Sequence, residues 1–532
     1  MKKPLLLSLV AATLIGTNLE AKNMYDRILG MEAQMNALQK EIAILQEANA
    51  KAAEDGEEDA EETEEVKVVD ERVIPIEDVL AIEDEEDEED DEESFEDERS
   101  IAELEESISE LNRATGGNHL KFNVDYRYAI DNMTYTMADD STASNRDFMT
   151  SRLWLNMGYK ATNNLTFKGQ LAYNKAFGVR SGASSAPYES IDWVTNENAY
   201  DDLLRVRTAY FLWQEQSFLG LDIPWTFSIG RRPSTGGNLI NLRDNDHATS
   251  PTGHLINVEF DGLSSRFTLN SDTGTSVKFC LGRGMSNAKT KFDPTPYADD
   301  STTNPDMDIA GLIFIPYDDR KFRLSTMYYY ANNLIDMTNG ANPALGFDTV
   351  GGLHAANIYL ISNGIGNEIS DFLDESIFFA SASMTKTDPY DAFKNVAGKG
   401  MLGSGDSETG YSYWIGTQFP SLLSEDGRWG LEYNQGSKYW RPITYGEDTN
   451  IGSKVAARGE AYEAYFTEYL EEDILSIQVR YTYIDYKYSG SNGFFGGQTG
   501  TPMNMDEAVA AGYGSAVVDK AQDIRFYIRY KY

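Results

Sequence analysis

Residues that could catalyse a reaction or bind a metal are few in this sequence. The chain has four histidines, His119, His247, His254 and His354, and one cysteine, Cys280. No motif brings a histidine to a serine, as a hydrolytic couple would require. His247 and His254 share a predicted loop but have no third ligand, and a single cysteine excludes a disulfide framework, a cysteine zinc cluster and a covalently attached haem. We therefore predict no catalytic residue, no metal and no cofactor, and we expect the loop histidines to be exposed to solvent.

Arginine and lysine recur at alternate positions of predicted strands, where they share one face with other polar residues. The acids that we place on this face are fewer, chiefly Asp125 and Glu432. Basic side chains that line a channel favour anions. The alternative is that these side chains pair with loop acids such as Asp244 and Asp246 and set no selectivity. The basic residues that we predict on this face are Arg152, Lys160, Lys168, Arg205, Arg207, Arg232, Arg323, Arg480, Arg525, Arg529 and Lys531.

Strands that begin at residue 119 must position these side chains. In one of them, Leu153, Leu155 and Met157 alternate with Arg152 and Asn156, which gives one apolar and one polar face. A strand that crosses a membrane in a barrel needs such an apolar outer face and a polar inner one. The tenth strand is the weakest and could be helical. The sixteen predicted strands are 119–129, 149–160, 165–175, 203–214, 225–231, 255–269, 276–283, 309–316, 321–331, 353–362, 376–386, 411–419, 428–436, 461–470, 474–488 and 522–532.

The connections between these strands alternate in length. Short connections such as 161–164, 317–320 and 471–473 follow the even strands, with 363–375 as the longest exception. Outer-membrane barrels combine short periplasmic turns, long extracellular loops and an even number of strands. We therefore predict an all-β fold, an antiparallel transmembrane β-barrel of about sixteen strands, and that number leaves an aqueous lumen. Long connections follow the odd strands at 130–148, 176–202, 232–254, 284–308, 332–352, 387–410, 437–460 and 489–521.

The first 118 residues differ from the rest of the chain in composition. Lys2 and Lys3 precede a short apolar run and the small residue Ala21, which is typical of a secretory signal peptide. The heptad spacing that follows predicts a coiled coil, or else one amphipathic helix packed on its own protein. The acidic tract after it predicts a disordered, solvated spacer, with a divalent-cation binder as the alternative. We predict a signal peptide at 1–21, a periplasmic coiled coil at 22–50, an acidic disordered linker at 51–99, a short helix at 100–118 and the outer-membrane barrel at 119–532.

Two stretches resemble the large Gram-negative porins and, within them, a porin-like family of unknown function with an N-terminal coiled-coil stretch. The terminal "RFYIRYKY" resembles the strand that the barrel-assembly machinery recognises, which implies an assembly signal at Phe526, Ile528, Tyr530 and Tyr532. The stretch "WTFSIGRRPSTGG" (225–237) is similar to the strand that precedes the inward-folding third loop of many porins.

In the porins that the chain resembles, the third loop narrows the lumen. The resemblance therefore implies a constriction loop at 232–254, with Arg243, Asp244 and Asp246 set against basic wall residues such as Arg205 and Arg207. It also implies outer-membrane lipid, lipopolysaccharide, the barrel-assembly machinery and small solutes as partners, and a homo-oligomer, with a trimer favoured.

The function that we expect is that of an outer-membrane porin, which passes small hydrophilic solutes by passive diffusion and prefers anions. The N-terminal segment would lie in the periplasm. The alternative is a structural tether, in which the barrel anchors the N-terminal segment between the outer membrane and the cell wall. The net charge of −41 argues against nucleic acid as a partner. The sequence names no solute and does not separate a general channel from a specific one.

Overall fold

The structure is a computed structural model of the chain. It describes residues 120–178, 203–285, 306–336, 348–364, 369–396, 398–444, 447, 449–490 and 500–532. The predicted signal peptide, coiled coil, acidic linker and short helix, together with His119, lie outside the described residues.

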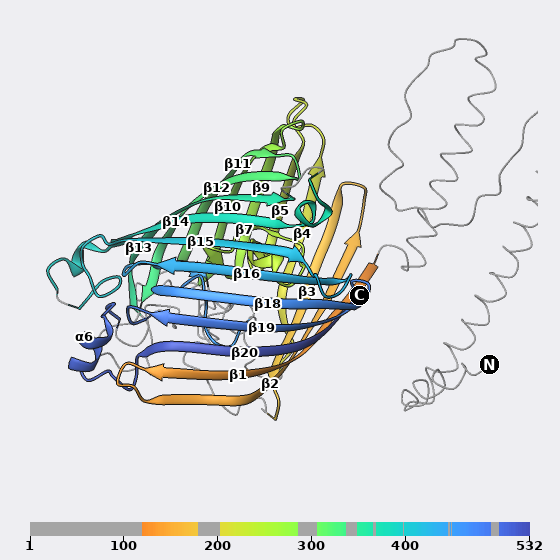
Figure 1. The fold of residues 1–532 in the computed structure, drawn as a ribbon. Helices are drawn as coiled ribbons and strands as arrows, with labels where there is room; N and C mark the ends of the chain where they lie inside the picture. The colour runs from red at the N-terminus through yellow and green to blue at the C-terminus, as the bar shows by residue number, and fades with distance from the viewer. Residues whose placement is uncertain are drawn as a thin grey trace, which may run out of the picture. The chain divides into compact units, whose positions relative to one another are not determined.

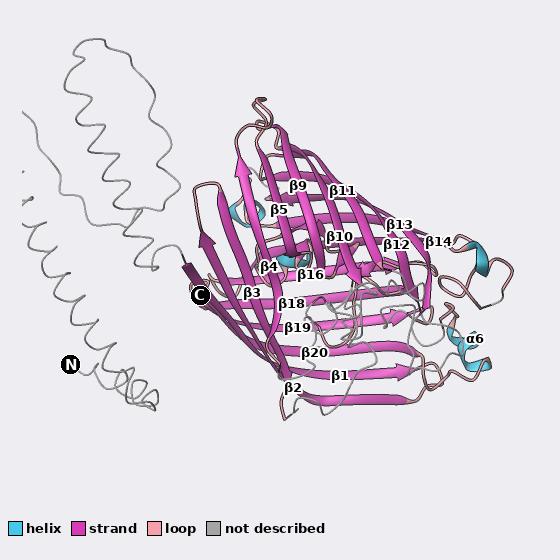
Figure 2. Ribbon diagram, turned by 180° about the vertical axis from the view of Figure 1, so that it is seen from behind, coloured by secondary structure: helices cyan, strands magenta, loops and turns pink. Residues whose placement is uncertain are grey.

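Sixteen antiparallel strands form one closed barrel (Figures 1 and 2), which confirms the predicted fold class and strand number. Closure joins the first strand to the last, where the backbone N–H of Val124 donates to the Tyr532 carbonyl at 2.7 Å. The barrel strands are β1 (Leu120–Met137), β2 (Thr142–Lys160), β3 (Leu165–Ala176), β4 (Arg205–Glu215), β5 (Trp225–Arg232), β9 (Phe260–Asn270), β10 (Thr275–Met285), β11 (Met307–Asp318), β12 (Phe322–Asp336), β13 (Asp348–Asn363), β14 (Ile377–Pro389), β15 (Thr409–Pro420), β16 (Gly427–Gly436), β18 (Gly459–Glu471), β19 (Leu475–Tyr486) and β20 (Val518–Lys531).

Short elements lie in the connections between these strands. The helix α6 begins with a capping box, in which Asn504 and Glu507 each accept a hydrogen bond from the other's backbone N–H. The short elements are β6 (Gly237–Asn238), η2 (Ile240–Leu242), β7 (Thr249–Thr252), β8 (Ile256–Asn257), α5 (Asp371–Asp374), η3 (Asp391–Phe393), β17 (Ile443–Thr444) and α6 (Met505–Ala510). In the described part of the chain, no helix is both long enough and apolar enough to cross a membrane.

Alternation of side chains gives every barrel strand an inner and an outer face. In β1 the side chains of Asp125, Arg127 and Asp131 are buried inside, whereas Phe122 and Tyr126 point outward and are exposed. The same period of two places the apolar residues of the last strand outside, where Ile524, Ile528, Tyr530 and Tyr532 are exposed. Their outward position agrees with the sequence, while recognition by the assembly machinery stays a prediction.

Turns at one end of the barrel are short and are fixed by their own polar side chains. Between β11 and β12, the Asp319 carboxylate accepts hydrogen bonds from the backbone N–H groups of Lys321 (3.0 Å) and Phe322 (2.5 Å). Between β2 and β3, the Thr162 hydroxyl oxygen accepts from the Leu165 N–H at 3.0 Å. These local bonds pin the register of the hairpins that they close.

The first connection is not the long loop predicted at 130–148. β1 and β2 continue to pair as far as Thr136 and Thr142, across a register shift between Asp131 and Met133, and a tight turn held by Asp139 and Ser141 joins them. The polar residues 139–147 favoured a loop, but Met133, Tyr135, Met137 and Phe148 pack in a buried apolar cluster that extends the hairpin. Residues 353–362, which could have been helical, lie within the strand β13.

A row of glycines brings three strands of one wall close together. Gly230, Gly262 and Gly282 lie opposite one another on β5, β9 and β10. A Cβ atom on Gly262 would lie 2.1 Å from the Leu281 carbonyl oxygen, so no other residue fits without displacing the backbone. Larger side chains resume on the next inner rows, where Ser264 and Cys280 are opposite one another.

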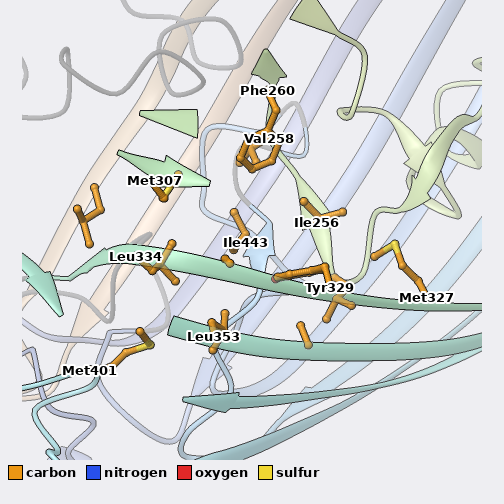
Figure 3. Close-up of a cluster of buried hydrophobic side chains, with 14 of the residues drawn as sticks. Ile256, Val258, Phe260, Met307, Met327, Tyr329, Leu334, Leu353, Met401 and Ile443 are labelled. Atoms are coloured by element: carbon orange, nitrogen blue, oxygen red, sulfur yellow. The ribbon is translucent and has the colours of Figure 1, made fainter. Parts of the chain in front are cut away.

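Two loops, which we call loop 3 (residues 233–259) and loop 7 (residues 437–458), pack inside the barrel. They meet through a parallel bridge between β8 and β17, in which Ile256 is opposite Ile443. Figure 3 shows this contact over β12 and β13, where both isoleucines lie in one buried apolar cluster with Tyr329 and Leu353. Fully burying one such side chain contributes about 1.5–3 kcal/mol, so the residues of this cluster together help to hold the two irregular loops against the wall.

Candidate lumenal site

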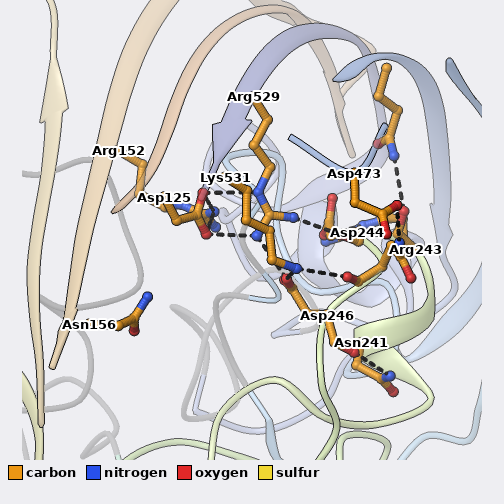
Figure 4. A network of polar contacts seen from close by, with 12 residues as sticks. Asp125, Arg152, Asn156, Asn241, Arg243, Asp244, Asp246, Asp473, Arg529 and Lys531 are labelled. Carbon is orange, nitrogen blue, oxygen red and sulfur yellow. Dashed lines mark hydrogen bonds and ion pairs between the residues drawn. The ribbon is translucent and has the colours of Figure 1, made fainter. Parts of the chain in front are cut away.

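Loop 3 contacts the inner face of β20 through acids at its tip. Asp246 accepts from Arg529 Nη2 at 2.7 Å and from Lys531 Nζ at 3.0 Å. Arg529 also binds Asp125 at 2.6 Å, and Asp125 binds Arg152 at 2.8 Å, so the network continues onto β1 and β2 (Figure 4). All five side chains belong to the predicted inner face or loop, and the structure brings them together.

The sequence-based prediction set the acids of loop 3 against Arg205 and Arg207, but in the structure these acids contact another part of the wall. Asp244 accepts from the Tyr527 hydroxyl at 2.8 Å, so both loop acids face β20 rather than β4. Arg207 on β4 instead pairs with Glu259 at 2.9 Å, and its guanidinium stacks 4.1 Å from the Trp154 ring. Glu259 falls within the strand predicted at 255–269, whereas in the structure it directly precedes β9. Arg205 lies near Arg207 on β4 and is half-buried.

A second buried network joins loops 3 and 7 to β16, β18 and β19. Glu463 is its centre, with Arg243 Nη1 at 3.4 Å, Arg480 Nε at 3.9 Å and a contact from Lys454 Nζ. Lys454 also binds Glu432 at 2.6 Å. The side chains of all five residues are at most 5% exposed, so each charge depends on its partners rather than on water.

The inner face carries more acids than the two predicted from the sequence. Asp131 fell in the predicted first loop, whereas Glu463 and Asp523 share a strand face with other inner residues and alternation could have identified them. The alternative of pairing with loop acids is confirmed for Arg529 and Lys531, which bind Asp246. The buried acids that the sequence prediction missed are Asp131, Glu259, Asp336, Glu447, Glu463 and Asp523.

The inner face from β3 to β12 has a different charge pattern. Among the described residues, no acid forms an ion pair with Lys168, Arg232, Arg266 or Lys278. Arg266 and Lys278 are directly opposite one another on β9 and β10. Other cations of these strands do have acid partners: Arg207 and Arg231 pair with Glu259 at 2.9 and 3.2 Å, and Arg323 pairs with Asp318 at 2.6 Å. Like charges on neighbouring strands repel, so this wall keeps an unbalanced positive potential.

Arg232 and Lys278 of this wall touch mainly neutral groups. The Arg232 guanidinium lies 5.3 Å from the centre of the Tyr210 ring, and the Lys278 ammonium donates to the Ser250 hydroxyl. The sequence prediction included Lys168, Arg232 and Arg323 but missed Arg266 and Lys278. Both follow from the same alternation, because Ser264 and Cys280, two positions away on each strand, also face inward.

His254 is not the exposed loop residue that we predicted. Its ring is fully buried, with Nδ1 2.8 Å from the Ser381 hydroxyl and Nε2 2.9 Å from the Ser412 hydroxyl. The rings of Trp414 and Trp440 lie 5.6 Å away on two sides. Burial lowers the pKa of His254 to about 3, so the ring is neutral at pH 7. The fold thus brings two serines to a histidine. Because no carboxylate of the described residues contacts the ring and solvent does not reach it, we assign the cluster a structural role, which is to anchor loop 3.

The other two histidines of the described residues, His247 and His354, do not gather with other ligands. His247 is exposed in loop 3, as predicted, and His354 Nδ1 lies 2.7 Å from the Tyr328 hydroxyl on the outer face. Within the described residues, no group of three or more His, Cys, Asp or Glu side chains has the arrangement of a metal site.

Solved structures with similar barrels come from outer-membrane proteins of three bacteria. Salmonella typhi OmpF, in complex with daunomycin, has 14% identity and a TM-score of 0.40, over 78% of this chain and 98% of that one. Vibrio cholerae OmpT, in its trimer form, has 10% identity and a TM-score of 0.40, over 78% and 100%. Pseudomonas putida OprB has 10% identity and a TM-score of 0.42, over 78% and 94%. A search of curated proteins by sequence found no match.

A family profile described as "Protein of unknown function (DUF3373)" matches residues 142–532. The match covers β2 to β20 and therefore nearly the whole barrel. The chain belongs to this family.

Proposed function

We propose that this member of the DUF3373 family is an outer-membrane porin that passes small hydrophilic solutes and prefers anions. The observation that carries the proposal is the set of inner-face cations without acid partners in the described part of the chain, Lys168, Arg232, Arg266 and Lys278, inside a closed barrel of sixteen strands. Barrels of this strand number are wide enough for an aqueous lumen, and lumenal cations raise the local concentration of anions.

The outer face supports insertion in a membrane. Large apolar side chains point outward from neighbouring strands and remain exposed, among them Phe167, Phe211, Ile229 and Leu281. A contiguous apolar surface of this kind is unfavourable in water and suits lipid. Trp213 and Trp225, whose rings are 5.4 Å apart, lie near the end with the short turns and suit an aromatic girdle. We place that end in the periplasm and expect lipid and lipopolysaccharide around the barrel.

The test is the reversal potential of the purified full-length protein in planar bilayers under a potassium chloride gradient. We expect a channel whose reversal potential indicates preference for chloride. Replacing Arg266 and Lys278 together by Gln should shift the reversal potential toward cation preference, because both positions lose a charge with which no acid of the described residues forms an ion pair. The matched control is Arg525→Gln on β20, where Asp131 lies 3.5 Å from the arginine and the side chain is buried.

Two outcomes would count against the proposal. Equal reversal potentials for the wild type and the Arg266→Gln, Lys278→Gln variant would contradict the proposal that these cations give the channel an anion preference. Complete absence of conductance from folded protein would remove the channel and favour the barrel-anchored tether. An assembly signal in the last strand and a homo-oligomer, with a trimer favoured, are further parts of the proposal.

A further inference from the structure

A cavity of about 90 Å³ lies between loop 3 and the inner wall formed by β9 to β12. Loop 3 contributes Ser234, Ser250 and Ile256 to its lining, and the wall contributes Lys278 and Tyr329. Because a cavity needs about 10–15 Å³ of such volume to hold one water, this cavity has room for several water-sized groups. It is therefore large enough for a small organic molecule.

One side of this cavity is polar and positively charged. Arg232 from the end of β5 and Lys278 from β10 both line it, together with the hydroxyl groups of Ser234 and Ser250. Neither cation has an acidic partner among the described residues. The Ser234 hydroxyl already donates to the Val258 carbonyl, whereas the Ser250 hydroxyl accepts from Lys278 and keeps its own hydrogen to donate. The two cations and the Ser250 hydroxyl can therefore bind a carboxylate by charge-assisted hydrogen bonds, which are stronger than bonds between neutral groups.

The rest of the lining is apolar. Phe260 follows loop 3, Ile309 and Ile313 come from β11, and Met327 comes from β12. Gly311 leaves the space between these side chains open, since a Cβ atom there would make only ordinary contacts, with its nearest neighbours at 3.5 Å. A strongly hydrated ion such as inorganic phosphate gains nothing from such walls, whereas a short alkyl chain does.

We propose that this cavity binds small organic acids, with the carboxylate at Arg232 and Lys278 and a short alkyl chain against Ile309, Ile313 and Met327. The site rests on the proposed function, because solutes must enter the lumen to reach it, and it names the class of solute that the channel retains. Ligand pockets are commonly of this kind, with mostly apolar walls and a few polar groups that fix orientation.

The native cysteine provides a direct probe. Cys280 is the one cysteine of the sequence and lines the same cavity. In folded protein in detergent, we expect an anionic sulfonate-bearing methanethiosulfonate to modify Cys280 about tenfold faster than a cationic trimethylammonium-bearing one, because two positive charges are close. Propionate should slow the modification, acetate should do so less, and inorganic phosphate at equal ionic strength should not. Cys280→Ser serves as the blank.

Two variants separate charge from shape. Lys278→Gln should abolish most of the preference for the anionic reagent and the protection by propionate. Gly311→Val should fill the cavity and abolish protection while leaving both cations in place. Lys168→Gln, which removes another cation of the same inner face away from the cavity, is the matched control and should leave protection unchanged.

Several results would overturn the proposal. These are equal rates with the two reagents, no modification by either, protection by phosphate equal to that by propionate, and unchanged protection in Gly311→Val. Because labelling requires no current, a protein that conducts but shows no protection would keep the proposed channel and lose this site. A protein that shows protection but no conductance would keep the site and lose the channel.

Discussion

The two sides of the inner wall differ in how their charges are balanced. On β16 to β20 and β1 to β2, arginines and lysines are buried in networks with acids of the wall and of loops 3 and 7, as in the contacts of Asp125 and Glu463. On β3 to β12, cations such as Arg232 and Lys278 have no acid partner in the described part of the chain. One barrel therefore contains a balanced half and a positive half, in which pairs such as Arg207 with Glu259 stand beside cations that no acid of the described residues pairs with.

This difference separates structural charges from charges that can act on a solute. A buried ion pair gains little net free energy, because desolvation opposes the attraction, but removal of one partner leaves an isolated buried charge. An unpaired lumenal cation is instead stabilised by water and by mobile anions. The balanced half thus helps to hold loops 3 and 7, together with the apolar contact over β12 and β13. In the proposed channel, the unpaired cations of the positive half would be the charges that act on a solute.

The largest expected effect is loss of stability when the centre of the balanced half is neutralised. Glu463→Gln leaves Arg243, Lys454 and Arg480 with one carboxylate fewer, so we expect a loss of about 3–5 kcal/mol. Urea denaturation of the refolded barrel in detergent measures it. Lys278→Gln, the matched change in the positive half, should alter stability by less than about 1 kcal/mol. Similar losses in both variants would mean that the two halves do not differ.

A smaller effect should follow acidification, through the anchor of loop 3. In the unfolded chain His254 binds a proton below the ordinary histidine pKa of 6.5, whereas in the folded protein its pKa is about 3. Between these values the unfolded state holds more protons, so stability falls as pH falls, by up to about 1.4 kcal/mol for each pH unit.

Other carboxylates titrate over the same range, so the comparison must be with a variant. Denaturation of the wild type and of His254→Asn at pH values of about 6.5 and 4.5 should show roughly 2–3 kcal/mol more loss in the wild type. An equal loss in both proteins would mean that the His254 ring is not held neutral by burial.

The sequence predicted the barrel well because alternation is a local signal. Strands such as β2 and β19 show an apolar and a polar face residue by residue. On β3, β19 and β20, the same alternation predicts that Lys168, Arg480 and Arg529 face the lumen. Failures occurred where the signal was not local. The run of polar residues at 139–147, at the tip of the first hairpin, is typical of a loop, and so Asp131 was assigned to one.

The partners of each side chain could not be predicted from alternation. Asp246 meets Arg529 across a separation of 283 residues, and only the path of loop 3 brings them together. Likewise His254 reaches Ser381 and Ser412 because loop 3 crosses the lumen to β14 and β15. A face is encoded in a few neighbouring residues, whereas a contact depends on the whole closed barrel.

The smallest expected effect concerns removal of one entire pair from the balanced half. Asp246→Asn with Lys531→Gln deletes two opposite charges. Arg529 loses the charge of Asp246 at 2.7 Å, but it keeps its contact with Asp125 at 2.6 Å and so is not left alone. The pair is partly exposed, with side chains 26% and 39% accessible, so the loss of stability should stay below about 1 kcal/mol. The net charge of the lumen is unchanged, and we expect the reversal potential in planar bilayers to match the wild type. A shift as large as that of the Arg266→Gln, Lys278→Gln variant would place the path of the ions along the tip of loop 3, and the division of the lumen into a balanced and a positive half would then fail.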